Sequence, residues 1–355
     1  MARPVHDPAR RRAARPAAAM LADRPTEPDR RPPPPSRGSV VGVDLGGTKI
    51  LAGAVDADLG VHHRARRLTP TGDVSALVEA VTQLVGEVRE AVDGDVLAVG
   101  FGIPCVIDRG RASSSVHLPL TDFPFAEAIS DLLGIPAFVD NDANLALLAE
   151  HLAGAALGAR DAVMLTLGTG IGGGLLLDGR IYRGSRGGAG ELGHMVVWAD
   201  GPDCGPGCPS RGCLESLASG TAVVREARRV AAERPQSALG RAQAGGAPIT
   251  GELVTRLAEQ GDDAAVEALE TVGRWLGVGV ASIANIFDPE LVVIGGGVIA
   301  AGELILGPAR AVLAQRALPP AGQAVRLAAA HFGADSGMLG AAVLAHESIN
   351  TRTVG

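Results

Sequence analysis

Hydrophobic and polar residues follow a pattern that occurs twice in this chain. An apolar run at residues 40–45 is followed by a Gly46-Gly47 turn and by a second apolar run at residues 50–55. The same order returns at residues 162–177, where the turn is Gly168-Thr169-Gly170. Short apolar runs on both sides of a glycine turn predict two strands joined as a hairpin. The two copies indicate a weak internal duplication.

The pattern between and after the hairpins changes repeatedly from helix to strand. Apolar residues at intervals of three and four predict helices near residues 74–92, 125–133, 144–157, 219–233, 249–259, 263–285, 301–315 and 337–346. Short apolar runs predict strands at residues 96–101, 137–139 and 291–294. Strands that alternate with helices are typical of an α/β fold.

The two glycine turns are candidate phosphate-binding loops. Glycine has no Cβ, so its backbone can approach phosphate oxygens closely and direct several N–H groups at them. One such turn alone is more often a plain turn in a sheet, but two facing turns could hold a triphosphate between two lobes. Asp44 adds a carboxylate suited to hydrated Mg²⁺, Thr48 and Thr169 add hydroxyl groups, and Lys49, the only lysine, adds an ammonium group.

Two other phosphate-binding motifs do not fit the sequence. The chain has no Gly-x4-Gly-Lys-Ser/Thr segment. Gly168, Gly170 and Gly173 have the spacing of a dinucleotide-binding motif, but the residues that follow predict a strand and a turn where that motif needs the start of a helix. We therefore discard the dinucleotide-binding interpretation.

A cluster of acids and amides follows the predicted strand at residues 137–139. Asp140, Asn141, Asp142 and Asn144 place four polar side chains within five positions. One such side chain is enough to cap the helix that begins there. The surplus predicts a site in which one carboxylate accepts a proton from an attacking hydroxyl group.

Three of the four cysteines lie close to one histidine in the sequence, as His194, Cys204, Cys208 and Cys213. Three thiolates and one imidazole form a complete ligand set for structural zinc. The metal would close a loop at residues 194–215 and would thereby hold Glu191 and Glu215 in place. A cysteine cluster of this kind indicates a metal site in a reducing cytoplasm, while the distant Cys105 is interpreted as a small core residue.

Composition and charge limit the partners that the chain can have. Its 355 residues are 46% hydrophobic, enough for a large core divided between two lobes. No apolar run reaches the roughly 18 residues that a membrane span requires. Residues 1–38 carry nine Arg and four acids, so the rest of the chain has a net charge of −12 within a total of −7. Such an acidic body suits neither DNA nor RNA.

Residues 1–38 are predicted to form a disordered Arg- and Pro-rich tail. They hold nine of the 23 prolines, lack hydrophobic periodicity and have no apolar signal core. Two alternatives stay open. Arg10, Arg11 and Arg12 could belong to a twin-arginine export signal, and translation from near Met20 or Val40 would leave the tail out of the mature protein.

Together these segments resemble the ROK family of bacterial repressors, open-reading-frame proteins and sugar kinases, and within it the bacterial glucokinases. The resemblance extends from about Val40 to the C-terminus. The motifs that carry it are DLGGTK at residues 44–49, NDAN at 141–144, LGTGIGGG at 167–174, GELGH at 190–194, the cysteine cluster, and Gly295-Gly296-Gly297.

The resemblance implies the duplicated actin-like fold of the ribonuclease H-like class, in which two lobes close on ATP-Mg²⁺ and a sugar. We expect an N-terminal lobe at residues 39–157, a C-terminal lobe at residues 158–336, and a helix at about residues 337–355 that packs on the first lobe. The implied activity is ATP-dependent phosphorylation of a hexose, glucose to glucose 6-phosphate, with ATP, Mg²⁺ and structural Zn²⁺ as cofactors.

The resemblance also implies roles for single residues. Asp142 matches the base that accepts the proton of the sugar's 6-hydroxyl as its oxygen attacks the γ-phosphate. The sugar-binding positions correspond to Asn141, Asp142, Glu191, His194 and Glu215, and His194 is also a zinc ligand. The ATP and Mg²⁺ positions correspond to Asp44, Gly46, Gly47, Thr48, Lys49, Gly168, Thr169 and Gly170, with Gly295, Gly296 and Gly297 near the adenosine.

Three features depart from the family pattern. The gap between Cys204 and Cys208 is three residues where the family usually has one, which gives Cys204 less weight as a ligand. Cys105 follows Pro104 where a glycine is frequent, and His117 lies where a sugar-contacting Asn is common. The hexose therefore stays open among glucose, fructose, allose and N-acetylmannosamine, and polyphosphate is an alternative donor.

The family's repressors provide a non-enzyme alternative, because they carry a DNA-binding helix-turn-helix before the sugar fold. Only 39 residues precede Val40 here, and they are interrupted by prolines and show no pair of helices. The sequence therefore favours a cytoplasmic enzyme that acts on small molecules, without nucleic acid or membrane partners. The family suggests a homo-oligomer, either a dimer or a tetramer.

Overall fold

The structure, a computed structural model, describes residues 38–115 and 118–353, which all belong to one compact unit at residues 35–355. The predicted tail at residues 1–38, apart from Gly38, lies outside the described residues, and so does His117. No helix within the described ranges is long and apolar enough to cross a membrane.

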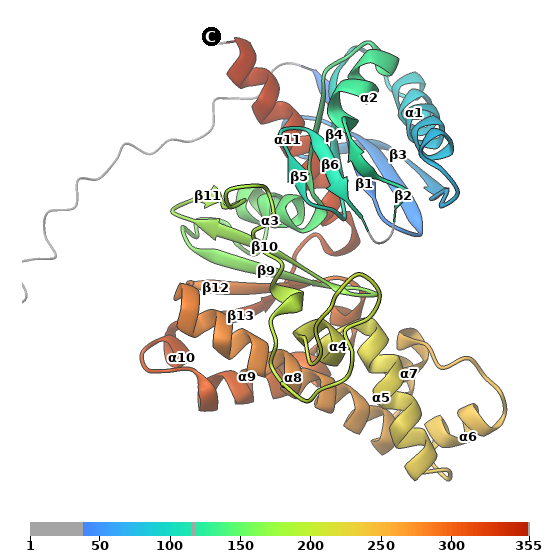
Figure 1. The fold of residues 1–355 in the computed structure, drawn as a ribbon, viewed down its shortest axis with the longest axis vertical. Helices are drawn as coiled ribbons and strands as arrows, with labels where there is room; N and C mark the ends of the chain where they lie inside the picture. The colour runs from blue at the N-terminus through green and yellow to red at the C-terminus, as the bar shows by residue number, and fades with distance from the viewer. Residues whose placement is uncertain (1–37, 116–117, 354–355) are drawn as a thin grey trace, which may run out of the picture. The chain divides into compact units, whose positions relative to one another are not determined.

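Two five-stranded sheets form the centre of the fold (Figure 1). The first has the order β3-β2-β1-β4-β8, with β1 (Ser39–Leu45), β2 (Lys49–Val55), β3 (Val61–Leu68), β4 (Val96–Ile103) and β8 (Ala137–Asn141). The second has the order β11-β10-β9-β12-β13, with β9 (Ala162–Leu167), β10 (Ile171–Leu177), β11 (Arg180–Ile181), β12 (Leu291–Gly295) and β13 (Arg326–Ala329).

The two sheets are built by the same plan. In each, the first two strands pair antiparallel as a hairpin, the third extends the hairpin side, and the last two pair in parallel on the other side. The predicted internal duplication is confirmed by this common strand order and direction. A third, small sheet of β5 (Ile107–Asp108), β6 (Arg111–Ser114) and β7 (Thr121–Phe123) follows β4.

Eleven α-helices lie in the described residues. They are α1 (Val74–Glu90), α2 (Phe125–Leu133), α3 (Asp142–Ala153), α4 (Leu214–Ala218), α5 (Gly220–Glu233), α6 (Ala238–Ala244), α7 (Gly251–Glu259), α8 (Asp263–Phe287), α9 (Glu303–Arg316), α10 (Ala321–Ala324) and α11 (Ser336–Thr353). Short 3-10 turns are η2 (Leu192–His194), η3 (Gly297–Ala301) and η4 (Gly333–Asp335).

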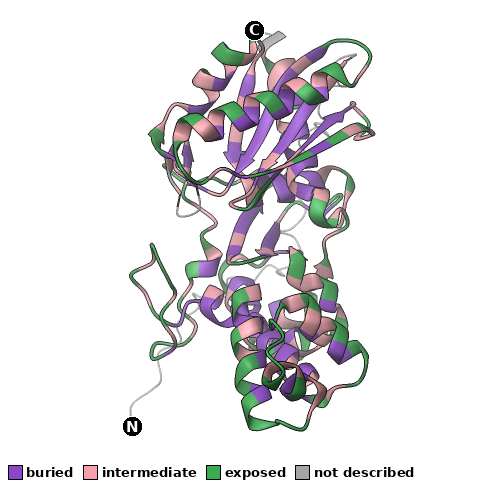
Figure 2. Cartoon of the chain, turned by 90° about the vertical axis from the view of Figure 1, so that its right-hand side faces the viewer, coloured by how far each residue is buried: buried purple, intermediate pink, exposed green. Residues whose placement is uncertain are grey.

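Helices cover both faces of the first sheet, which explains why its central strands are apolar on both sides (Figure 2). Val41, Val43 and Leu45 of β1 are buried in the cluster that includes α1 and α2. Residues of β1 that point the other way, beginning with Val40, pack with α11. Asp44 is on this second face, at the carboxyl end of β1.

Two helices, α3 and α11, pack closely against each other. A Cβ at Gly340 of α11 would lie 1.8 Å from the carbonyl oxygen of Leu145 in α3. On its other side α11 meets the first sheet, where a Cβ at Gly100 would lie 1.8 Å from the carbonyl oxygen of Ala341. Helix α3 packs in turn on the second sheet, since Leu147 shares a core with Met164 of β9. The two helices therefore form the layer between the sheets.

The sequence analysis did not predict β3 or β13, because β3 has no apolar run and the only residue of β13 that is both apolar and larger than alanine is Leu327. β3 reads Val-His-His-Arg-Ala-Arg-Arg-Leu and buries only Ala65 among its eight residues, as an edge strand can. Two predicted helices have different bounds in the structure. The helix predicted at residues 144–157 begins at Asp142 and ends at Ala153, next to Gly154. The helix expected near residues 337–346 from the apolar pattern, and at about 337–355 from the resemblance, spans Ser336–Thr353.

Candidate active site

Two carboxylates lie together at the carboxyl end of the first sheet. Asp44 is the half-buried sixth residue of β1, and Asp142 is the first residue of α3, after β8. Burial, and then the nearby charge of Asp142, raise the pKa of Asp44 to about 7, although Lys49 acts in the opposite direction. Two carboxylates this close repel each other unless a cation or a proton lies nearby. The pair is therefore suited to a divalent cation.

Most side chains of the acidic cluster at residues 140–144 form hydrogen bonds or ion pairs within the protein. Asp140 is buried, and its Oδ2 accepts from Arg183 at 2.7 Å from Nε and 2.6 Å from an Nη. Asn141 caps α3, since its Oδ1 accepts from the backbone N–H groups of Ala143 (3.0 Å) and Asn144 (3.2 Å). Asp142 stays half-buried at the helix N-terminus. The structure thus distinguishes Asp140, a buried carboxylate paired with Arg183, from Asp142, a half-buried carboxylate whose charge acts on Asp44.

The first glycine turn is held by the backbone. The N–H of Gly46 donates to the carbonyl of Lys49 at 3.0 Å, and the hydroxyl of Thr69 donates to the carbonyl of Gly46 at 2.6 Å. The side chains of Thr48 and Lys49 are exposed, while Gly47 is half-buried. The turn therefore presents its polar side chains to an incoming ligand.

The second glycine turn meets the start of a helix. The N–H of Gly168 donates to the carbonyl of Gly170 at 2.9 Å, and the N–H of Gly220, the first residue of α5, donates to the carbonyl of Gly168 at 2.8 Å. The hydroxyl of Thr221 donates to the carbonyl of Thr169 at 2.8 Å. The N-terminus of a helix attracts anions, so α5 adds to the phosphate-binding character of this turn.

Gly220 and Thr221 were not predicted as site residues. The sequence did contain a signal, because Ser219 precedes an apolar-periodic segment and its hydroxyl caps α5 by accepting from Ala222 N–H at 3.2 Å. What the sequence could not give was the location of this helix start next to a turn some 50 residues earlier.

The predicted adenosine loop lies next to the second turn. Gly295 ends β12, and Gly296 has φ +84°, a conformation that favours glycine. A Cβ at Gly296 would lie 2.4 Å from the carbonyl oxygen of Leu167, the last residue before Gly168. Gly297 is exposed and begins η3. The loop and the second turn therefore form one continuous surface.

The predicted sugar-binding residues gather around the first residues of β10. Oε2 of Glu215 accepts the N–H of Ile171 at 2.8 Å, and Oε2 of Glu191 lies 3.9 Å from Nε2 of His194. The segment before Glu191 touches the same strand, because a Cβ at Gly173 would lie 2.2 Å from the carbonyl oxygen of Gly190.

Helix α3 approaches β10 from its other side. Ala143, which follows Asp142, is the contact, because a Cβ at Gly172 would lie 3.1 Å from the Cβ of Ala143. Asn141 donates to the carbonyl of Cys105 at 3.4 Å.

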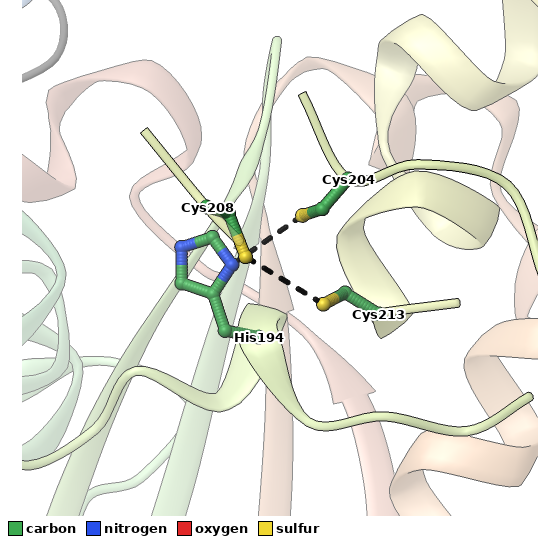
Figure 3. Close-up of side chains that lie close together, drawn as sticks. All are labelled: His194, Cys204, Cys208 and Cys213. Atoms are coloured by element: carbon green, nitrogen blue, oxygen red, sulfur yellow. Dashed lines mark hydrogen bonds between the residues drawn. The ribbon is translucent and has the colours of Figure 1, made fainter. Parts of the chain in front are cut away.

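The four predicted zinc ligands lie together, and Cys204 belongs to the group in spite of its unusual spacing (Figure 3). The ligand atoms of His194, Cys204, Cys208 and Cys213 are all within 4.8 Å of one another. The sulfurs of Cys208 and Cys213 are 3.9 Å apart, and the sulfur of Cys204 is 3.4 Å from Nδ1 of His194.

These distances fit a tetrahedral zinc site. Zn–S bonds of about 2.3 Å give sulfur–sulfur edges of about 3.8 Å in a tetrahedron. Burial raises the pKa of the Cys204 and Cys213 thiols, so a dication is the group that would hold them as thiolates. Glu215 connects this cluster to the second turn, because its other oxygen is 3.6 Å from the sulfur of Cys204.

Comparisons with known proteins agree with one another. A model of the ROK family matches residues 40–348. A glucokinase of Streptomyces coelicolor is 37% identical over 317 residues, which is 87% of this chain and 98% of the relative. An N-acetylmannosamine kinase of Citrobacter koseri is 35% identical over 312 residues, 86% of this chain and 98% of the relative. The solved ROK family glucokinase of Streptomyces griseus, in complex with glucose and AMPPNP, is 36% identical with a TM-score of 0.79, over 87% of this chain and 99% of that one.

Proposed function

The chain belongs to the ROK family, and we propose that it is an ATP-dependent sugar kinase that converts glucose to glucose 6-phosphate. The fold that the resemblance implied, the duplicated actin-like fold with two lobes, is confirmed by the match to the Streptomyces griseus enzyme. The glucokinase relatives support glucose as the acceptor, and the AMPPNP bound to that solved relative supports ATP as the donor.

The observation that carries the mechanism is the arrangement of Asp142 and Asp44. Asp142 lies at the N-terminus of α3, next to β10 and the residues proposed to bind sugar, and its charge acts on Asp44. In the proposed reaction, the sugar's 6-hydroxyl oxygen attacks the γ-phosphorus, its proton passes to the carboxylate of Asp142, and the bond to the β-phosphate oxygen breaks to release ADP.

We assign the remaining roles from position. The two glycine turns, with Thr48, Lys49 and Thr169, would hold the phosphates, and Gly295 to Gly297 would lie near the adenosine. Asp44 is suited to hydrated Mg²⁺, which would neutralise charge on the phosphates. Glu191, His194, Glu215 and Asn141 would bind the sugar.

We propose zinc at His194, Cys204, Cys208 and Cys213 in a structural role. The ligand set has no open position, so the metal would take no part in the chemistry. Its effect would be to fix η2, with Glu191 at its start, relative to Glu215 of α4.

The division into lobes remains part of the proposal. Residues 39–157, with the returning helix α11, would form the lobe that carries Asp44 and Asp142, and residues 158–336 the lobe that carries the second turn and the zinc loop. We propose in addition a cytoplasmic enzyme of glycolysis that assembles as a dimer or tetramer.

A coupled ADP-release assay over a panel of sugars tests the proposal. Glucose with ATP should give the highest kcat/KM, above fructose, allose, mannose and N-acetylmannosamine, and polyphosphate should be a poorer donor. A higher kcat/KM for N-acetylmannosamine would move the chain to the other activity represented among its relatives. Release of ADP with none of the sugars would refute the proposed function.

A further inference from the structure

A fully buried carboxylate lies in the layer between the two sheets. Glu150, in the last turn of α3, has no exposed surface. Within the part of the chain that the structure describes, no basic side chain forms an ion pair with it. Burying a charge without a cation is costly, so such a residue needs compensating hydrogen bonds.

Four neutral donors supply these hydrogen bonds. Oε2 of Glu150 accepts the backbone N–H groups of Ala155 at 2.8 Å and His331 at 3.0 Å. Oε1 accepts the N–H of Phe332 at 2.9 Å and the hydroxyl of Ser336 at 3.2 Å. Charge-assisted hydrogen bonds of this kind are about twice as strong as neutral ones, so the carboxylate holds its donors firmly.

The donors come from the two places where the chain passes between the sheets. Ala155 lies in the connection from α3 to β9, and residues 331–336 connect β13 to α11. A single side chain therefore joins both connections, and it also joins α3 to the first residue of α11.

Helices α3 and α11 also reach the two carboxylates of the site: α3 contains Asp142, and α11 contacts Asp44. Asp142 begins α3, eight residues before Glu150, a distance of about 12 Å along the helix. Gly337, the second residue of α11, lies against Asp44, because a Cβ there would be 2.9 Å from the Cγ of Asp44. Glu150 thus connects the helix of the proposed base to the helix end that supports the proposed metal-binding carboxylate.

We propose that Glu150 is a positioning residue for phosphoryl transfer. By holding the end of α3 against the start of α11, it sets the position of Asp142 relative to Asp44, and so the approach of the sugar hydroxyl to the γ-phosphate. This inference rests on the proposed function. A displacement of about 1 Å in such a site can reduce turnover about 100-fold, even when the substrates still bind.

The first test replaces the carboxylate by an amide. In Glu150→Gln, the amide NH₂ faces N–H donors and cannot accept from them. We expect kcat for glucose phosphorylation to fall about 10- to 100-fold, with KM for glucose and for ATP within about threefold of wild type. The control is Glu290→Gln, since Glu290 also accepts two backbone N–H groups, from Arg160 at 2.8 Å and Asp161 at 3.3 Å, and neither donor belongs to α11. It should keep the wild-type kcat.

The second test moves the carboxylate without changing it. A Cβ at Gly154 would lie 2.2 Å from Oε2 and 2.9 Å from Cα of Glu150, so Gly154→Ala should displace Glu150 with its carboxylate and give the same loss of kcat. Gly86→Ala is the matched control, because a Cβ there has nothing within 4 Å. Ser336→Ala removes one donor only and should give a smaller loss. Gly154→Ala and Ser336→Ala provide the test if circular dichroism and thermal unfolding show that Glu150→Gln does not fold.

The outcomes separate the two proposals. A folded Glu150→Gln or Gly154→Ala protein with wild-type kcat would overturn the positioning role, and so would a raised KM with unchanged kcat. Both results leave the kinase activity of the wild type intact. A wild-type chain that phosphorylates no sugar would refute the proposed function, and this inference with it.

Discussion

Replacement of Asp142 by Asn is the most direct test of the proposed mechanism. The substitution keeps the size of the side chain, and Asn can still accept the N–H of Ala143, which lies 2.9 Å from Oδ1 of Asp142. It removes the carboxylate that would accept the sugar's proton. General-base catalysis contributes about 10²- to 10⁴-fold, so we expect kcat to fall by that factor, equivalent to about 2.7–5.4 kcal/mol.

The same substitution should change stability little. A negative charge in the first turn of a helix contributes about 0.3–1 kcal/mol. Its loss is offset because the repulsion between Asp142 and Asp44 disappears as well. The free energy of unfolding should therefore stay within about 1 kcal/mol of wild type, and KM for glucose within about threefold.

A matched control lies two residues away. Asp140→Asn is chemically the same change, but Asp140 is buried in its pair with Arg183. Because the side chain of Arg183 is itself 42% exposed, we expect a moderate loss of about 1–3 kcal/mol in the free energy of unfolding. The loss of kcat should be smaller than in Asp142→Asn. Urea unfolding and the coupled ADP-release assay measure the two quantities. Turnover above one tenth of wild type in Asp142→Asn would show that the base lies elsewhere.

Three further predictions concern the zinc loop, Asp44 and the sugar-side glycines. Purified protein should contain about one zinc per chain, and chelation should lower stability and activity. Chelation should also change tryptophan emission, because Trp198 of the loop stacks on Trp275 of α8 with ring centroids 5.6 Å apart. Metal analysis that finds no zinc would contradict this prediction. Asp44→Asn should abolish turnover yet stabilise the magnesium-free protein above pH 7. The pKa of Asp44 is raised from 3.8 to about 7, so its carboxyl group lowers the stability of the wild type progressively as pH rises between these values, by at most about 4 kcal/mol. Equal unfolding free energies of variant and wild type at pH 8 would refute this prediction. Gly173→Ala should raise KM for glucose several-fold more than KM for ATP, since the added Cβ pushes the segment before Glu191; an unchanged KM for glucose in steady-state kinetics would exclude that link.

Several parts of the fold were predictable because their signals are local. The two glycine hairpins, the strand at residues 291–294 and the helix at residues 125–133 are all present, since each depends on an apolar run or period bounded by glycine or proline. The edge strands β3 and β13 were missed for the complementary reason. Each pairs with one neighbour only, β2 for β3 and β12 for β13, and an exposed edge places little demand on its own residues.

The chemistry of the site was partly predictable in the same way. The sequence determined which residue types were available: two glycine turns, an excess of acids and amides after one strand, and three thiols with an imidazole. It also carried the family resemblance, and the family model matches residues 40–348.

Only the tertiary structure decided how these residues are used. It paired Asp140 with Arg183, brought the charge of Asp142 near Asp44, placed the sulfur of Cys204 3.4 Å from Nδ1 of His194, and placed the start of α5 at the second turn. It also buried Glu150 among donors that lie up to 186 positions away. The physical reason is that a side chain's charge, exposure and partners depend on segments brought together by sheet pairing and helix packing, whereas a local pattern reports only the propensity and chemistry of its own segment.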